Sequence, residues 1–358
     1  MIKRGIQASS MALLFALAAC AAPAAPAVST APTIAPPTAA TSASIPTAPP
    51  SAPTVPTVAP ITASAAAARP AAPTMAPPTH PTPQPTGPAP AKTALRFDGQ
   101  QAYKVALDQC AIGPRPPGTA EIQKTRDYIA QTLQANGWTV EQQKFTFRGV
   151  DGVNIIGKRG TGPVTILGAH YDTRPVADQD PDPAKQKTPI IGGNDGASGV
   201  AVLLELARAW RDTPPPGETW LTFFDLEDRG ELDGWPWGVG SDYMAGHLTA
   251  TPKQMILVDM VGDSDQQIYL ERTSDQALLK RIFDVAQSLG YGQWFIPQPR
   301  HALLDDHTPF LQRRIPAVDI IDFDYPYHHT VSDDCTKIAA DSMERVGRTL
   351  EQFMNGGG

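Results

Sequence analysis

The 358-residue sequence has few cysteines, no long hydrophobic run and a very uneven distribution of acidic and aromatic residues. It contains only 3 cysteines, which excludes a disulfide-rich scaffold. Its apolar stretch near the N-terminus, residues 11–17, is too short to span a bilayer. No internal repeat is visible, so a solenoid built from sequence repeats is excluded. Residues 21–90 have no acidic and no aromatic residue, and such a segment cannot bury a core.

The N-terminal residues 1–19 have the layout of a secretory signal, with Lys3 and Arg4 before the apolar stretch and small residues after it. The run that ends at Cys20, Leu-Ala-Ala-Cys, resembles the bacterial lipoprotein signal, in which the cysteine is lipidated and becomes the new N-terminus. We therefore expect an exported protein that Cys20 anchors to the cell membrane or envelope, with its catalytic part outside the cytoplasm. The alternative is an ordinary cleaved signal that happens to end near a cysteine.

Residues 20–93 predict a disordered linker rich in proline, alanine and threonine. Twenty of the 38 prolines lie between positions 21 and 90. At ~3.1 Å per residue, an extended proline-rich chain of this length reaches on the order of 200 Å. All 36 acidic residues lie after position 94 with 25 of the 29 basic ones, so the predicted catalytic domain, residues 94–358, carries a net charge of −11. This charge argues against a nucleic-acid partner.

The predicted catalytic domain alternates strand and helix patterns. The expected strands cover residues 138–140, 145–147, 164–169, 220–224, 255–258 and 317–321, and the expected helices cover 118–137, 199–210, 275–289 and 340–353. This alternation predicts an α/β fold, a single three-layer αβα domain with a mixed, centrally parallel β-sheet. The domain contains two cysteines, Cys110 and Cys335. They could form one disulfide in an oxidising compartment, but the sequence does not show whether they meet.

Polar residues follow directly after three of the buried strands. His170 follows the first, Glu227 and Asp228 follow the second, and Asp259 follows the third. Sites in open α/β sheets form at the carboxyl ends of strands, so we expect these side chains to meet. A glycine-rich loop at residues 192–199 lacks the glycine order of a phosphate-binding loop. Its Asp195 either caps the following helix or points a carboxylate into the site.

Together, these residues predict a zinc site. Asp195, Asp228 and a late histidine supply two carboxylates and one imidazole and leave a coordination position open, the pattern of a catalytic zinc. His329 is the best candidate for that histidine, and Glu227 is the natural general acid and base. The plain alternative for Glu227 and Asp228 is a solvated acidic turn.

As an ordered set, these residues resemble the zinc-dependent peptidase-like family that includes M28 aminopeptidases and glutaminyl cyclases, over roughly residues 100–355. Three segments look more like glutaminyl cyclases than aminopeptidases: residues 113–118, the tryptophan-bearing insert 234–237, and residues 304–311. In residues 304–311, an alternative interpretation is that Asp306 and His307 only cap the helix that begins near Pro309.

The cyclase resemblance implies one zinc ion on Asp195, Asp228 and His329, with Glu227 moving the proton. It also implies a hydrogen-bonded network through Asp259 and Asp305 and a pocket wall from Trp235 or Trp237. The aminopeptidase pattern implies a second zinc ion on His170 and Asp259, with Asp195 bridging both ions.

The chain departs from the cyclase pattern at two positions. The usual second glutamate is Asp228, and the usual Trp-His pair is His328-His329. The second change places His328 at the pocket and makes it a rival ligand to His329. Here the resemblance favours His329, because it directly precedes Thr330.

The resemblance implies a glutaminyl-peptide cyclotransferase, which converts the N-terminal glutamine of peptides or proteins to pyroglutamate and releases ammonia. The alternative enzyme is a di-zinc aminopeptidase that hydrolyses N-terminal residues. A third hypothesis is a non-catalytic zinc-binding or peptide-binding lipoprotein, and the presence of Glu227 argues against it.

Overall fold

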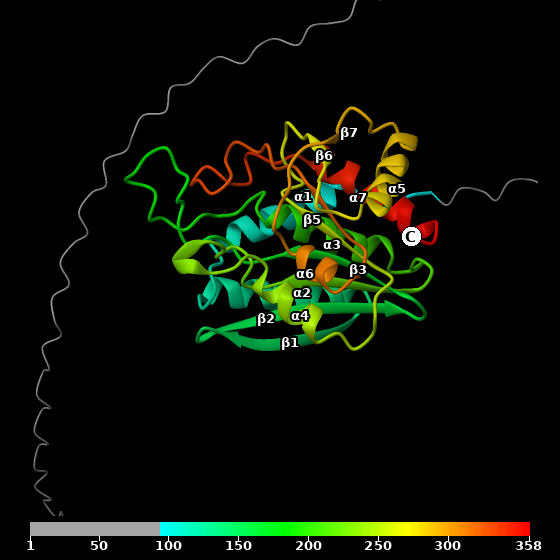
Figure 1. Ribbon diagram of the computed structural model, residues 1–358, viewed down its shortest axis with the longest axis horizontal. Coiled ribbons are helices and arrows are strands. Elements are labelled where there is room, and N and C mark those ends of the chain that lie inside the picture. The colour runs from blue at the N-terminus through cyan, green and yellow to red at the C-terminus, as the bar shows by residue number, and fades with distance from the viewer. Residues whose placement is uncertain (1–93) are drawn as a thin grey trace, which may run out of the picture. The chain divides into compact units, whose positions relative to one another are not determined.

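The computed structural model describes residues 94–358 (Figure 1). The helices are α1 (Gly99–Ile112), α2 (Ala120–Ala135), α3 (Ala197–Ala209), α4 (Val239–Gly246), α5 (Gln276–Ser288), α6 (Thr308–Gln312) and α7 (Ala340–Asn355). The strands are β1 (Thr139–Phe147), β2 (Val150–Gly160), β3 (Val164–His170), β4 (Glu218–Phe224), β5 (Gln254–Asp259), β6 (Ile268–Leu270), β7 (Phe295–Pro299) and β8 (Ala317–Ile321). Between residues 94 and 358, no helix is long and apolar enough to cross a membrane. The predicted signal, Cys20 and the linker lie outside the described residues.

The main sheet has six strands in the order β1-β2-β4-β3-β5-β8. Strands β4, β3, β5 and β8 run parallel to one another, and β1 and β2 add an antiparallel edge. This arrangement confirms the predicted mixed, centrally parallel sheet. Strands β6 and β7 form a small separate parallel sheet. The parallel strands end at the same edge, which places the residues that follow them side by side.

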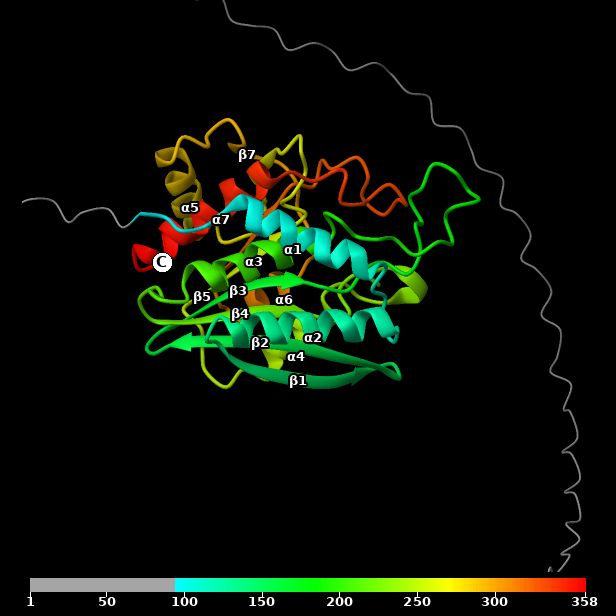
Figure 2. The same ribbon diagram turned by 180° about the vertical axis from the view of Figure 1, so that it is seen from behind.

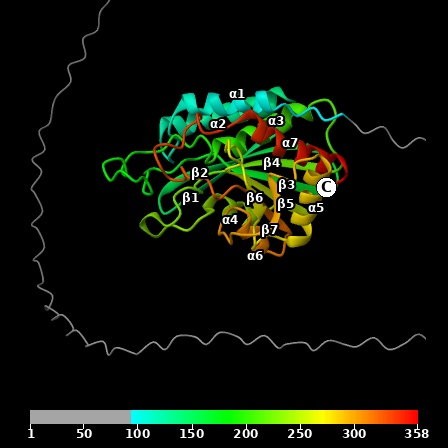
Figure 3. The same ribbon diagram turned by 90° about the horizontal axis from the view of Figure 1, so that it is seen from above.

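Helices cover both faces of the sheet, as Figures 2 and 3 show. Helices α1, α2, α3 and α7 lie over one face, and α4 and α6 lie over the other. Side chains alternate between the faces along each strand: Leu167 and Ala169 belong to the core under α3, whereas Ile166 packs in the core of α4 and α6 with Met244 and Phe310. Strand β3 is therefore buried on both faces, as its continuous apolar sequence predicts.

The predicted elements fall within a few residues of the observed ones, but β1 was predicted as two strands, and α1, β2, α4, β6 and β7 were not predicted. Strand β1 is continuous where two short strands were predicted, because its middle residues Glu141–Lys144 are polar. Strand β2 contains three glycines and helix α1 has a weak apolar pattern, so neither was predicted. Helix α1 is instead capped by Asp98, whose carboxylate accepts hydrogen bonds from the backbone N–H groups of Gln100 and Gln101.

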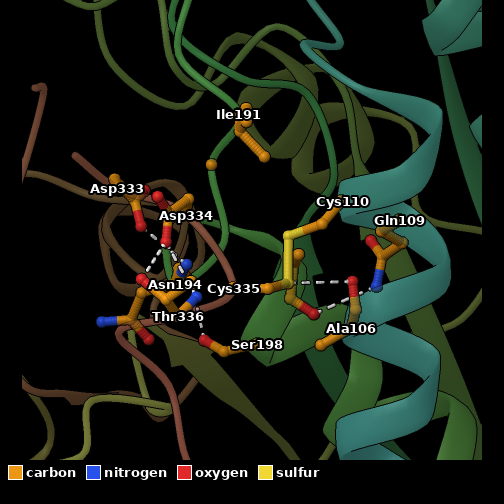
Figure 4. The surroundings of a disulfide bond; sticks show 12 residues. Ala106, Gln109, Cys110, Ile191, Asn194, Ser198, Asp333, Asp334, Cys335 and Thr336 are labelled. Atoms are coloured by element: carbon orange, nitrogen blue, oxygen red, sulfur yellow. Dashed lines mark hydrogen bonds between the residues drawn. A yellow bond between two sulfur atoms is a disulfide. The ribbon is translucent and has the colours of Figure 1, made fainter. Parts of the chain in front are cut away.

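Cys110 and Cys335 form a disulfide with a Cα–Cα distance of 6.3 Å (Figure 4). The bond joins α1 to the loop that precedes α7, across a sequence separation of 225 residues. That loop also carries His329 and Asp333. The disulfide thus fixes a loop of the candidate site to the outer helix layer.

Candidate active site

The predicted site residues gather at the carboxyl edge of the parallel strands. Strand β3 ends at His170, which pairs with Phe224 at the end of β4, and β5 ends at Asp259. The main hollow at this edge has a volume of about 380 Å³. Its lining includes carboxylates, histidines and aromatic side chains: Asp195, Glu227, Asp228, Asp259, Asp305, His328, His329, Trp237 and Phe323.

Asp195 enters the site from the glycine-rich loop before α3. Helix α3 has Gly196 as its N-cap and no side-chain cap, so the helix-capping alternative for Asp195 is wrong. Glycine is required at position 196 because a Cβ there would lie 2.6 Å from His170 Nε2. The carboxylate of Asp333 holds the loop by accepting hydrogen bonds from the backbone N–H groups of Asn194 and Asp195, at 2.9 and 3.3 Å. Sequence reasoning did not assign this role to Asp333.

His329 faces two carboxylates with one edge of its ring. Its Nε2 lies 3.3 Å from Asp228 Oδ1 and 3.7 Å from Asp195 Oδ2. Its Nδ1 faces the side chains of Gln179 and Asp178, at 3.1 and 3.8 Å. Burial lowers the pKa of His329 to about 4, so its imidazole is neutral near pH 7, the form that binds metals. The backbone of His329 has a φ of 55°, an uncommon conformation that aims the ring inward.

Asp195 and Asp228 both approach His329 Nε2, as the predicted zinc site requires, whereas the two compact ligand groups of the described residues, Asp195–His328–His329 and His170–Asp195–Asp259, do not include Asp228. Both carboxylate oxygens of Asp228 are buried without a hydrogen-bond partner in the described part of the chain. Buried carboxylates without a partner are costly, and a cation removes that cost. Two carboxylates and a neutral imidazole are suitable ligands for zinc.

His328 also approaches this group, with its Nε2 3.8 Å from Asp195 Oδ2. Its ring centroid lies 3.6 Å from that of His329. His329 contacts both Asp195 and Asp228, which favours it as the ligand. His328 also belongs to a compact possible ligand group, with Asp195 and His329.

A second possible metal group surrounds His170. His170 Nε2 lies 3.0 Å from Asp195 Oδ1 and 3.0 Å from Asp259 Oδ1. Burial alone would lower the pKa of His170, but Asp259, Asp172 and Asp195 together raise it well above its ordinary value. The three residues that the aminopeptidase pattern assigns to a second ion are therefore adjacent.

Glu227 lines the same hollow as Asp195 and Asp228, and hydrogen bonds to its backbone fix its position. The carboxylate of Asp172 accepts hydrogen bonds from the backbone N–H groups of Glu227 and Asp228, each at 3.2 Å. Glu227 Oε2 lies 3.8 Å from His170 Nδ1. Burial, with Asp305 among the nearby acids, raises the pKa of Glu227 well above its ordinary value. The turn of Glu227 and Asp228 is thus a buried, fixed feature, which contradicts the solvated-turn alternative. Asp172 had no predicted role.

The two tryptophans of the insert have different surroundings. Trp237 lines the hollow and stacks on His329, with ring centroids 6.0 Å apart. Trp235 instead lies in a small apolar cluster with Phe145, Leu226 and Val239. The resemblance implied that Trp235 or Trp237 forms a wall of the pocket. In the structure Trp237 lines the pocket and Trp235 does not.

Arg174 is a further site residue that the sequence did not single out. Its guanidinium lies 5.5 Å from the Trp237 ring centroid and 3.6 Å from Asp228 Oδ1. Two hydrogen bonds to Asp178, at 2.6 and 2.9 Å, fix its orientation. Its positive charge offsets part of the negative charge of the site.

Asp305 lines the hollow, whereas Asp306 and His307 are buried behind it. Neither caps α6, whose N-cap residue His307 makes no side-chain cap hydrogen bond. His307 Nε2 lies 2.8 Å from Thr273 Oγ1 instead. Burial and the nearby Asp259 raise the pKa of Asp305 well above its ordinary value.

Comparisons with known proteins identify the family to which this fold belongs. Residues 154–354 match the Peptidase family M28. The fold is similar to the glutaminyl cyclase of Bacteroides thetaiotaomicron, with 32% identity, a TM-score of 0.70, and 73% of this chain and 99% of that chain covered. It is also similar to a Zn-dependent exopeptidase of Parabacteroides distasonis, with 33% identity, a TM-score of 0.69, and coverage of 73% and 100%.

A third relative is the glutaminyl-peptide cyclotransferase-like protein of Bos taurus. It is 24% identical, and the match covers 67% of this chain and 70% of that protein. The family match spans more than half of the chain and includes all three expected ligands of one zinc ion. The chain therefore belongs to the M28 peptidase family, and its relatives include glutaminyl cyclases.

Proposed function

We propose that this protein is a zinc-dependent glutaminyl-peptide cyclotransferase. It would convert the N-terminal glutamine of peptides or proteins to pyroglutamate and release ammonia. The observation that carries the proposal is the buried Glu227, fixed beside Asp195, Asp228 and His329 in a hollow walled by Trp237. The similarity to glutaminyl cyclases supports the same reaction.

Asp195, Asp228 and His329 would hold one zinc ion. When bound, zinc supplies a Lewis acid that polarises the side-chain carbonyl of the glutamine. The chain's own task is to orient the substrate so that its α-amine reaches the carbon of that carbonyl. Trp237 offers an apolar wall for the glutamine side chain, and the guanidinium of Arg174 packs over the Trp237 ring.

Glu227 would move the proton that the reaction displaces. The α-amine nitrogen forms a bond to the side-chain carbonyl carbon, and the bond from that carbon to the amide nitrogen breaks. Glu227 takes a proton from the amine and gives it to the departing nitrogen, which leaves as ammonia, so no water is consumed. Burial raises the pKa of Glu227, so its carboxylate is a stronger base for the amine proton than that of an exposed glutamate. Asp259 and Asp305 lie beside it and would share in the hydrogen-bonded network.

A di-zinc aminopeptidase is the second candidate, because His170, Asp195 and Asp259 also form a compact ligand group. A peptidase needs a metal-activated water, with Glu227 as its base. Mass spectrometry of one glutamine-leading and one leucine-leading peptide separates the two functions. Loss of ammonia alone supports the cyclase, and shortening of the leucine-leading peptide supports the peptidase. Zinc content of the folded protein, one or two ions per chain, is an independent test.

We further propose that the protein is exported and anchored to a membrane by lipid on Cys20. The signal-like residues 1–19 support export, and so does the Cys110–Cys335 disulfide, because such bonds persist in oxidising compartments. Incorporation of a labelled fatty acid by the wild-type protein, and its loss in Cys20→Ala, is the expected result. Equal labelling of both proteins would contradict the anchor.

A further inference from the structure

A second hollow, larger than the metal pocket, adjoins it. It has a volume of about 520 Å³ and lies between the end of β1, helix α4 and helix α6, on the face of the sheet that Figure 3 shows with α4 and α6. Trp237, Leu304 and Asp305 line both hollows. The two hollows therefore adjoin at these three residues. We call the second hollow the side groove.

The floor of the side groove is aromatic. Phe145 and Tyr243 stack with ring centroids 4.9 Å apart, and Tyr243 stacks on His247 at 4.0 Å. Phe147 and Val239 add apolar surface beside them. Aromatic side chains fit such a surface through stacking and edge-to-face contacts, as well as through burial of apolar area.

The charged groups at the groove edge compensate one another. Arg313 Nη2 lies 3.0 Å from Asp242 Oδ1, and Arg313 Nη1 donates to the carbonyl of Pro309 at 3.0 Å. Because this pair is neutral as a whole, the edge gives no preference for a charged side chain. At the junction with the metal pocket, Leu304 is 69% exposed, which leaves an apolar surface open to a ligand that crosses it.

We propose that the side groove binds the residues that directly follow the N-terminal glutamine, and that it selects aromatic or large apolar side chains at the second or third position. This inference rests on the proposed function. A glutamine held by the metal pocket must continue its chain outward, and the side groove adjoins that pocket at Trp237, Leu304 and Asp305. Residues spaced ~3.3–3.6 Å apart in an extended chain reach it within a few positions.

The test measures ammonia release from glutamine amide, Gln-Ala-Ala and Gln-Phe-Ala, with Gln-Ala-Phe as a fourth substrate. The wild-type kcat/KM for the better phenylalanine peptide is expected to exceed that for Gln-Ala-Ala roughly tenfold. Gly246→Leu adds bulk to the groove, because Gly246 lines it; the new Cβ would lie 3.3 Å from Arg313 Nη2, so the flexible guanidinium must shift slightly. The variant is expected to bring the ratio of the two kcat/KM values close to one, and Gly246→Ala is expected to have an intermediate effect.

Ala250→Leu is the matched control, since it adds the same side chain at an exposed position that lines neither hollow. It should keep the wild-type ratio, and thermal unfolding should show that all variants are folded. An equal ratio in wild type and Gly246→Leu overturns the proposal. A groove that instead seats a second copy of the chain would also leave the ratio unchanged, and sedimentation would show a dimer that Gly246→Leu dissociates. Absence of ammonia from every substrate would refute the cyclase function itself, a separate outcome from the loss of selectivity.

Discussion

The carboxylate of Asp172 accepts a hydrogen bond from the backbone N–H of Asp228 at 3.2 Å, and its other oxygen accepts one from Glu227. A proposed zinc ligand and the proposed proton carrier are thus positioned by one buried side chain. Asp333 acts in the same way on the backbone of Asp195. In each of these two turns, a carboxylate from a distant segment accepts hydrogen bonds from the backbone N–H groups. The turn is thereby held in the conformation that directs Asp228 or Asp195 into the site.

Replacement of Asp172 by asparagine should reduce activity without unfolding the protein. The asparagine amide group cannot accept from both N–H groups, so the turn of Glu227 and Asp228 loses its fixed position. Changes to groups that orient metal ligands typically cost 10–100-fold, and we expect a loss of about that size in kcat/KM. Asp284→Asn, an exposed change on α5, should behave as wild type. Wild-type kinetics in Asp172→Asn would show that the turn keeps its conformation without the hydrogen bonds to Asp172.

Glu227→Gln should abolish turnover while zinc stays bound. Glutamine keeps the size of the side chain but cannot take up and return a proton, and general acid–base catalysis contributes about 10²–10⁴-fold. His329→Ala should lose both turnover and zinc, because it removes a proposed ligand. Zinc content by elemental analysis and ammonia release together distinguish the two variants. Normal turnover in Glu227→Gln would remove this residue from the mechanism.

Removal of the metal should lower stability as well as activity. The buried carboxylates Asp195 and Asp228 lie close to Glu227 and Asp259, and without a cation their repulsion opposes folding. A chelator is therefore expected to lower Tm, and added zinc should restore both Tm and ammonia release. An unchanged Tm after complete removal of zinc would contradict a metal held by these side chains.

Acidification should destabilise the fold through His307. Burial lowers the pKa of His307 to about 4 from an ordinary value of 6.5. The unfolded chain therefore binds a proton between these pH values when the folded chain does not, so stability is lost as pH falls from about 6.5 toward 4. The loss is at most about 3.5 kcal/mol, since each unit of pKa difference corresponds to about 1.4 kcal/mol.

Urea unfolding of the wild type and of His307→Gln at pH 7 and pH 5 measures this effect. The variant should show a smaller loss of unfolding free energy between the two pH values. Gln101→Ala is the control, because Gln101 is an exposed, non-titrating residue on α1, and it should show the wild-type loss. Equal losses in wild type and His307→Gln would assign the acid sensitivity to other groups.

Reduction of the Cys110–Cys335 disulfide should weaken the fold and the site together. Loss of a native disulfide typically costs roughly 2–5 kcal/mol, more for long loops. Here the released loop carries His329 and Asp333, so zinc affinity should fall as well. A reducing agent is expected to lower Tm and zinc occupancy in the wild type and to change neither in a Cys110→Ala/Cys335→Ala double variant. A wild type that keeps its zinc after reduction would show that the loop is held by other contacts.

Local sequence patterns were sufficient to predict the fold class and the main members of the candidate site. Buried strands have continuous apolar sequences, and in a parallel sheet the residues that follow them meet at one edge. His170, Asp228 and Asp259 could therefore be assigned to one place from local patterns alone. The ligand types, two carboxylates and an imidazole, then indicated zinc.

The side chains that support these residues could not be predicted, because they come from distant parts of the sequence. Asp333 contacts Asn194 across a sequence separation of 139 residues, and Cys110 pairs with Cys335 across 225. Trp235 and Trp237 are both tryptophans, two positions apart, yet Trp235 packs in an apolar cluster and Trp237 lines the site. No local pattern distinguishes such cases, because they depend on which distant segments the packed helices and strands bring together.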